Sequence, residues 1–321
     1  MDEFKCTHPF VDTPTTLPCC EFEEPHDLNS YGGRADVLCG LLRFINPRRK
    51  VAVKAFRAGI SMISVENEIR IWRLLGTHSH IASFIGIAPV NQYDEKYLAK
   101  GLVSEYCAQG NIQVYLGKSD PDVTNHLLRF QLLKDVIRGL THVHAQSIVH
   151  GDLKAYNVLV DGNEDTQVAR ICDFGSSSIN CTCYSGPQEQ DGTLPWDSPE
   201  LWMPGDDGDD GGDGDDGDQT RLRTKRSDVW AFGCVALEVQ MGLTPWDPLY
   251  TYNTEVMIGR QFRARTGPPA TVMDPNLDLK AHPIKQQVWD LMVGCWSADP
   301  QQRPTAAELS EKMLCMNPGA A

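Results

Sequence analysis

Two short segments in the middle of the chain carry charged and amide side chains at spacings that random composition rarely supplies. They read HGDLKAYN at residues 150–157 and DFG at residues 173–175. Asp152 in the first segment can accept a proton from a hydroxyl group, and Lys154 can bind a phosphoryl group during its transfer. Because such groups act on one reacting centre, the fold has to bring both segments to the same cleft.

Two oxygen ligands and a second cation extend this set. Asn157 and Asp173 offer the oxygens that Mg²⁺ prefers, and a bound cation makes the Asp173 charge tolerable in a desolvated cleft. Lys54 ends the buried-strand pattern at 51–53, and Glu68 lies beside an apolar helical stripe, where a carboxylate needs a cation. A lysine that ends a strand is ordinarily a surface charge. Lys54, however, precedes both segments in the chain, and Glu68 lies between Lys54 and the first of them. This order favours a phosphate-binding role for Lys54.

Hydrophobic periodicity separates a strand-rich first part from a helix-rich second part. The first part has one helical pattern at 65–75 among short β-like runs, which lie at 37–39, 41–45, 51–54, 81–90 and 102–106. In the second part, Asp122 can cap a long helix that leads to His150, and two more helical patterns start at Ser227 and span about 282–295. We therefore expect a small antiparallel sheet followed by a larger helical region.

An acidic, glycine-rich run interrupts the second part at residues 206–218. It contains eight Asp and five Gly, so that −6 of the formal net charge of −14 remains for the rest of the chain. Like charges among flexible glycines cannot bury apolar surface, and we expect a disordered insertion over 204–219. Its glycines lack the spacing and the terminal Glu of an EF-hand loop. The chain has no basic footprint, so nucleic acid is not an expected partner.

The first residues and the cysteines bear on the cellular compartment. Residues 1–26 have no helical or strand period, which indicates a loose tail, and no apolar run approaches the roughly 20 residues of a membrane span. The eleven cysteines lie mostly in apolar runs, which favours reduced, buried thiols, and Cys181 with Cys183 makes a poor zinc site. We expect no membrane partner and a cytoplasmic protein, with the nucleus as the alternative.

From about Asn29 to Met313 the chain resembles a eukaryotic protein kinase domain of the serine/threonine type, most similar to the tyrosine-kinase-like group seen in fungi. Besides the two central segments, the matching motifs are GTLPWDSPE at 192–200, SDVWAFG at 227–233, CW at 295–296 and DPQQRPT at 299–305. The resemblance implies the α+β, bilobal protein kinase fold. In that fold, an N-lobe of mostly antiparallel β-sheet with one main helix precedes a larger, mainly helical C-lobe.

The resemblance also implies how the chain divides. The divisions are a tail at 1–26, an N-lobe at 27–104, a hinge at 105–110, a C-lobe at 111–315 that includes the insertion, and a tail at 316–321. Three structural elements are implied with it: a stack of Trp72, Phe174 and His150 between the lobes, a buried ion pair of Glu200 with Arg303, and Asp228 holding the backbone of the catalytic loop.

For the site, the resemblance implies ATP and Mg²⁺. Its catalytic residues would be Asp152 as the base, Lys154 beside the transferred group, and Lys54 with Glu68 at the α- and β-phosphates. The Mg²⁺ ligands would be Asn157 and Asp173. The nucleotide would contact the backbone of Glu105 and Cys107, the side chains of Val37, Ala52 and Leu159, and the loop with Gly32 and Gly33. Ser104 would control access to a back pocket.

Two departures from the family pattern modify these expectations. The glycine-rich loop appears as SYGGRA at 30–35 and keeps one of the three expected glycines, so we expect weakened nucleotide binding. Gly151 replaces the arginine that in many kinases pairs with a phosphorylated activation segment. We therefore expect activity that does not depend on phosphorylation of that segment, whose candidate acceptors are Ser176, Thr182, Tyr184 and Ser185.

Two classes of function remain open at this point. The first is an ATP- and Mg²⁺-dependent kinase that transfers the γ-phosphoryl group to Ser or Thr of a protein substrate, a specificity inferred from Lys154 and Thr193. The second is a kinase-fold pseudoenzyme that binds nucleotide or a partner. The full set of charged residues favours the enzyme, because a scaffold has no chemical need for all of them. The protein substrate and the oligomeric state cannot be read from the sequence.

Overall fold

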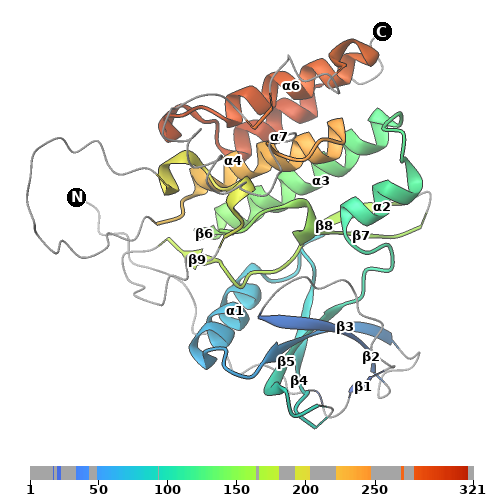
Figure 1. Cartoon of the computed structure of the whole chain (residues 1–321), viewed down its shortest axis with the longest axis vertical. Helices are drawn as coiled ribbons and strands as arrows, with labels where there is room; N and C mark the ends of the chain where they lie inside the picture. Colours follow the sequence, from blue (N-terminus) through green and yellow to red (C-terminus); the bar gives the residue numbers. More distant parts are fainter. Residues whose placement is uncertain are drawn as a thin grey trace, which may run out of the picture.

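The computed structural model describes residues 17, 20–22, 34–42, 49–92, 94–163, 166–180, 192–202, 222–246, 269–270 and 278–316. One lobe is built around a β-sheet with a single helix, and the other is mainly helical (Figure 1). The bilobal α+β fold expected from the sequence is therefore present.

Five antiparallel strands form the sheet of the first lobe, in the spatial order β1-β2-β3-β5-β4. Their bounds are β1 Cys20–Phe22, β2 Ala35–Leu42, β3 Arg49–Arg57, β4 Phe84–Pro89 and β5 Tyr97–Glu105. The expectation of a tail without strands over 1–26 is wrong for residues 20–22, because Cys20 pairs with Leu42 of β2. A strand of three residues is too short to show an alternating pattern in the sequence.

The helix α1 (Met62–Leu75) packs against this sheet. Ser61 caps its N-terminus by accepting a hydrogen bond from the Ile63 amide. The helix extends the predicted stretch 65–75 toward the N-terminus, because Met62 and Ile63 are exposed and lie off the apolar stripe that the prediction followed. Glu68, which was expected beside the stripe, is buried.

Helices make up the second lobe, with bounds α2 Ile112–Ser119, α3 His126–Ala145, α4 Lys225–Ala236, α6 Pro283–Cys295 and α7 Ala306–Cys315. The central helix α3 contacts α4, α6 and α7. A π-helical turn, η4 (Leu237–Met241), continues α4. Single 3₁₀ turns are η1 Ala155–Asn157, η2 Leu194–Trp196, η3 Pro199–Leu201, η5 Leu279–Ala281 and η6 Pro300–Gln302.

The predicted cap of the long helix is wrong. Helix α3 begins at His126, and its cap is Asn125, whose side chain accepts the Leu128 amide at 3.1 Å. Asp120 is the buried carboxylate of this turn and pairs with Arg129 at 2.5 Å. Asp122, between Asp120 and Asn125, is exposed. Hydrophobic periodicity does not distinguish capping side chains that lie so close together in the chain.

Two pairs of short strands flank the central segments of the sequence. Strand β6 (Ile148–Val149) pairs with β9 (Ser178–Ile179), and β7 (Val158–Asp161) pairs with β8 (Val168–Ile171). Between them, the ring of Phe174 lies 5.4 Å from that of His150 and 5.8 Å from that of Trp72 on α1. This confirms the predicted stack, which joins the helix of the first lobe to the catalytic loop.

Other expectations concern the insertion, the cysteines and membranes. The insertion at 204–219 lies outside the described residues, as do Cys181 and Cys183. The cysteines whose side chains the structure describes are free thiols and, apart from Cys315, are wholly or partly buried, in agreement with the sequence analysis. None of the helices in the described part of the chain is long and apolar enough to cross a membrane.

Candidate active site

Lys54 of β3 balances two carboxylates from different parts of the chain. Its Nζ lies 2.7 Å and 2.9 Å from the two carboxylate oxygens of Glu68 on α1 and 2.7 Å from Oδ1 of Asp173. Burial on its own would lower the Lys54 pKa, but Asp173 and Glu68 outweigh it and raise the pKa above the ordinary value. The sequence-predicted pair of Lys54 and Glu68 is therefore formed and extends to the DFG segment.

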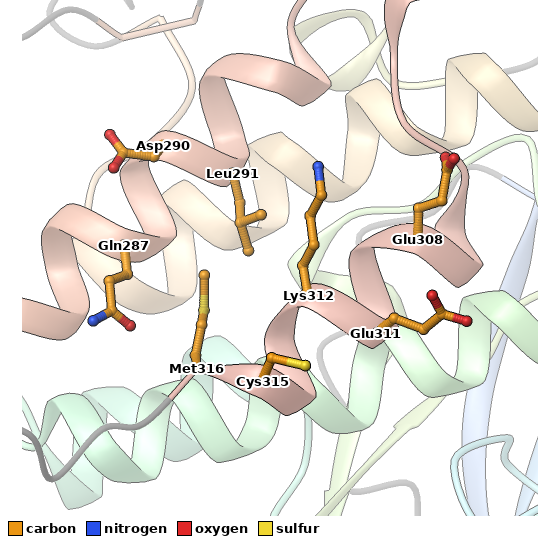
Figure 2. Close-up of a pocket in the computed structure, with 8 residues that line it drawn as sticks. All are labelled: Gln287, Asp290, Leu291, Glu308, Glu311, Lys312, Cys315 and Met316. Atoms are coloured by element: carbon orange, nitrogen blue, oxygen red, sulfur yellow. The ribbon is translucent and has the colours of Figure 1, made fainter.

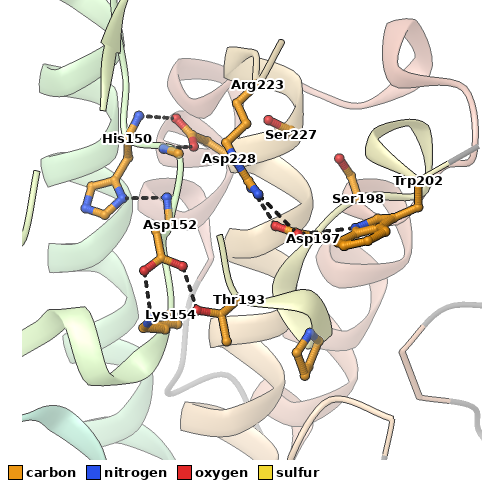
Figure 3. A network of polar contacts seen from close by, with 12 residues as sticks. His150, Asp152, Lys154, Thr193, Asp197, Ser198, Trp202, Arg223, Ser227 and Asp228 are labelled. Atoms are coloured by element: carbon orange, nitrogen blue, oxygen red, sulfur yellow. Dashed lines mark hydrogen bonds and ion pairs between the residues drawn. The ribbon is translucent and has the colours of Figure 1, made fainter. Parts of the chain in front are cut away.

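Asp152, Lys154 and Thr193 form a triangle of hydrogen bonds (Figure 3). Lys154 Nζ lies 2.7 Å from Asp152 Oδ2 and 2.6 Å from Thr193 Oγ1, and the Thr193 hydroxyl donates to Asp152 Oδ1 at 2.8 Å. Asn157 Nδ2 donates to the Asp152 carbonyl at 2.8 Å, which ties the end of the loop back to its start. Each carboxylate oxygen of Asp152 thus has a partner that fixes the orientation of the group.

Asp228, at the start of α4, holds the backbone of the catalytic loop. Its carboxylate accepts the amide of His150 at 2.8 Å (Figure 3). It also accepts the amide of Gly151 at 2.9 Å and lies 2.9 Å from His144 Nε2. Burial would raise the pKa of Asp228, but these partners lower it and keep the carboxylate ionised. The role expected for Asp228 is confirmed.

The ion pair expected between Glu200 and Arg303 is also present. Two guanidinium nitrogens of Arg303 lie 2.7 Å from the two carboxylate oxygens of Glu200, and the guanidinium lies over the Trp230 ring at 5.1 Å. Arg303 is 1% exposed, so its charge depends on this partner. The pair anchors the end of segment 192–200 to the helical lobe.

The residues expected around adenine lie on strands of both lobes. Val37 on β2 lies opposite Lys54, Ala52 on β3 lies opposite Ser104, and Leu159 comes from β7. Val37, Ala52 and Leu159 are half-buried apolar side chains, which suits a flat apolar ligand between the lobes.

The predicted hinge begins at the last residue of β5, Glu105, and its two predicted contact residues, Glu105 and Cys107, are buried. Glu105 donates its amide to the Ser83 carbonyl at 3.1 Å, and its side chain accepts the Ser83 amide at 2.7 Å. Burial, with Asp161 and Glu105, raises the pKa of the Cys107 thiol to about 12 and keeps it neutral. Gly32 and Gly33 lie outside the described residues.

Asn157 and Asp173 retain oxygens for a metal ion. Asn157 uses its Nδ2 for Asp152, which leaves its amide oxygen, and Lys54 bonds one oxygen of the 43%-exposed Asp173 carboxylate. Burial raises the Asp173 pKa, but Lys54 outweighs it and lowers the pKa, so the carboxylate is ionised. The described residues include no cluster of three or more His, Cys, Asp or Glu fit for a metal ion. An amide and a carboxylate, completed by phosphate oxygens, fit Mg²⁺.

Some residues of the site were missed by the sequence analysis. Arg223, just ahead of α4, pairs with Asp197 at 2.5 Å, and Glu238 accepts the Trp196 indole at 2.7 Å. Asp197 lies within the motif at 192–200, but a sequence motif does not reveal a partner that is distant in the chain.

An open groove of about 810 Å³ lies between α6 and α7 and is lined by residues that include Asp290, Leu291 and Lys312 (Figure 2). None of the sequence-predicted site residues lines it. The candidate active site is therefore recognised by its ion pairs and not by this groove.

This fold and this set of interactions define a protein kinase domain. The model of the protein kinase domain family matches residues 41–314, and the chain belongs to this family. Proteins of this family use ATP and a divalent metal ion.

Three relatives illustrate the range of similar proteins. The chain is 30% identical to the tyrosine-protein kinase Srms of Mus musculus over 67% of this chain and 37% of the relative. It is 28% identical to the serine/threonine/tyrosine-protein kinase HT1 of Arabidopsis thaliana over 63% of this chain and 44% of the relative. It is 27% identical to the MAP kinase kinase kinase mkh1 of Schizosaccharomyces pombe over 93% of this chain and 22% of the relative. The chain thus spans less than half the length of each.

Proposed function

We propose that the chain is an ATP-dependent protein serine/threonine kinase that transfers the γ-phosphoryl group to protein hydroxyls. The observation that carries this proposal is the triangle of Asp152, Lys154 and Thr193, in a site that also holds the cluster of Lys54, Glu68 and Asp173. A proton acceptor and cations for a triphosphate are the groups that phosphoryl transfer requires.

In the proposed reaction Asp152 accepts the proton of the attacking hydroxyl, in an orientation fixed by Lys154 and Thr193. Lys154 neutralises charge on the transferred group, and Lys54, held by Glu68, neutralises the α- and β-phosphates. A Mg²⁺ ion bound by Asn157 and Asp173 would supply charge neutralisation at the phosphate oxygens.

The preference for Ser and Thr rests on the contact between Lys154 and Thr193. Lys154 follows the proposed base by two residues and bonds both Asp152 and the Thr193 hydroxyl. The names of the relatives include a tyrosine-protein kinase and a serine/threonine/tyrosine-protein kinase. The acceptor residue therefore has to be measured.

The test measures phosphate transfer from radiolabelled Mg-ATP to Ser/Thr and Tyr peptide libraries, with wild type and Asp152→Asn. Removal of a general base costs about 10² to 10⁴ in rate, so we expect a loss of that order in the variant and labelling of the Ser/Thr library. Asp290→Asn, the same change at a carboxylate on α6 outside the site, is the matched control and should retain activity.

Equal incorporation by wild type and Asp152→Asn would contradict the proposal. It would point to a contaminating activity and to a nucleotide- or partner-binding scaffold. Labelling confined to the Tyr library would leave the kinase proposal in place and overturn the proposed acceptor.

A further inference from the structure

Gly151, which precedes the proposed base, occupies a position where a side chain does not fit. Its φ is +82°, a conformation that favours glycine. A Cβ built at this position would overlap the carbonyl oxygen of Ser176 and would lie 3.4 Å from Cδ of Arg223. The catalytic loop therefore has no cationic side chain at position 151. The aliphatic part of Arg223 lies next to the space that a side chain at this position would enter.

Arg223 instead brings a guanidinium group to the loop from the segment ahead of α4. Its two terminal nitrogens lie 2.5 Å and 3.1 Å from the two carboxylate oxygens of Asp197 (Figure 3). The Trp202 indole also donates to Asp197, at 3.2 Å. The side chains of Arg223 and Asp197 are 11% and 3% exposed, so this bidentate pair is largely desolvated.

The guanidinium also packs against the backbone next to Thr193. A Cβ built at Gly192 would overlap the guanidinium group of Arg223, so only glycine allows this approach. Thr193 follows directly and bonds both Asp152 and Lys154. A short path of contacts therefore leads from Arg223 through Gly192 and Thr193 to the proposed base.

The charges around Arg223 agree with this arrangement. Burial on its own would lower the Arg223 pKa, but Asp197, and then Asp152 and Asp228, raise it above the ordinary value. In the described part of the chain, the Asp197 carboxylate is bonded by Arg223 and by the neutral Trp202 indole, so the loss of Arg223 would remove the cation paired with this buried carboxylate.

We propose that Arg223 is a positioning residue, which supplies from the chain itself the cation that Gly151 lacks and holds residues 192–197 against the catalytic loop, so that Thr193 keeps Asp152 and Lys154 in place. This inference rests on the proposed kinase function for its effect on catalysis. Its structural part, the attachment of residues 192–202 by Arg223, does not.

The test compares wild type with Arg223→Lys, Arg223→Gln, Asp197→Asn and the Arg223→Gln/Asp197→Asn double variant. We expect kcat to fall about tenfold to hundredfold in Arg223→Gln while the KM for ATP stays unchanged, because misplacement acts on the base and not on the nucleotide site. Arg223→Lys keeps the charge without the bidentate geometry and should recover part of the loss. The fall in kcat in the double variant should be no larger than in the more impaired single variant, because Arg223→Gln and Asp197→Asn remove the same interaction.

Hydrogen exchange of peptides spanning residues 192–202, measured on the same proteins, reports the attachment directly. Exchange there should accelerate in Arg223→Gln and Asp197→Asn while α6 and α7 keep their rates. Arg138→Gln is the matched control, because Arg138 on α3 pairs with Asp135 at 3.5 Å and not with this network.

The outcomes separate the two proposals. If wild type transfers no phosphate, the kinase function fails, while the exchange rates still decide whether Arg223 holds the segment. Unchanged exchange at 192–202 in a folded Arg223→Gln protein would overturn the attachment. Accelerated exchange with kcat within twofold of wild type, or a parallel rise in the KM for ATP, would overturn the positioning role.

Discussion

The ammonium group of Lys54 neutralises two carboxylates in the candidate active site. Lys54 Nζ is within 2.7 Å of both Glu68 and Asp173, and its side chain is 19% exposed. Glu68 is 2% exposed and has no access to bulk water that could replace the lysine. The charge of Lys54 is therefore needed by the folded protein as well as by a bound triphosphate.

The change Lys54→Met should reduce stability as well as activity. Removing one partner of a buried ion pair costs about 3 to 5 kcal/mol, because the remaining carboxylates lose their counter-charge. Urea denaturation measures this loss. In Lys54→Met/Glu68→Gln the uncompensated charge is reduced, so stability should partly recover while phosphate transfer stays lost. If the double variant were no more stable than Lys54→Met, the electrostatic cause would be refuted.

At this scale the sequence predicted most charged residues of the site but not all their partners. Asp152, Lys154 and Asn157 lie in one segment, so their spacing alone indicated that they act together. Arg223 and Asp197 are 26 residues apart in the sequence and form their ion pair only in the folded protein, so no sequence spacing marks them as partners. Long-range pairs of this kind need the structure.

At the scale of elements, the turn between α1 and β4 is held against α3 by histidines. The His78 and His142 rings are stacked with centroids 4.2 Å apart, and His80 lies 3.6 Å from the buried Asp135. Burial, and then the neighbouring His142 and His80, lower the pKa of His78 from 6.5 to about 4. The turn thus joins the first lobe to the second through an imidazole that is neutral at pH 7.

Stability should therefore fall as the pH decreases from about 6.5 toward 4. Over this window the unfolded chain binds a proton at His78 that the folded chain does not, so the free energy of unfolding rises with pH. Urea unfolding midpoints at pH 7 and pH 5 measure the difference. His78→Asn has no titrating ring and should show a smaller difference than wild type. An equal loss in both proteins would assign the effect to other groups.

Hydrophobic periodicity predicted the helices correctly where the apolar stripe was long. The stretch 65–75 and the patterns at Ser227 and 282–295 correspond to α1, α4 and α6. The cap at Asp122 and the strand at 20–22 were not recognised, because a cap depends on one side-chain bond and a three-residue strand on a partner elsewhere in the chain. Caps and very short strands leave no periodic pattern in the sequence, and these are therefore the features that the sequence did not predict.

At the scale of the whole molecule, one cluster of buried hydrophobic residues extends through both lobes, and a second, smaller cluster lies within the first lobe. Ala35, Phe56 and Leu102 of the sheet belong to the same cluster of buried residues as Leu140 and Val229 of the helical lobe. Trp72 and Phe174 belong to this cluster, and the His150 ring packs against Phe174 at its edge with a centroid distance of 5.4 Å. A ligand that contacts both lobes should therefore stabilise the whole chain and not one lobe alone.

Mg-ATP should raise the stability of the whole chain in a single transition. At a free concentration of about 100 times Kd, the gain should be roughly 2.7 kcal/mol, and weak contacts from the altered glycine loop would move the required concentration upward without changing this relation. Ala52→Trp places a bulky ring where adenine is expected and should abolish the shift. Lys100→Ala, a change on the same sheet that breaks only an exposed pair with Glu66 of α1, should keep the Mg-ATP stabilisation. The stabilisation is measured by thermal unfolding of each protein in a titration with Mg-ATP. If Mg-ATP still stabilised Ala52→Trp, the nucleotide would bind elsewhere on the protein.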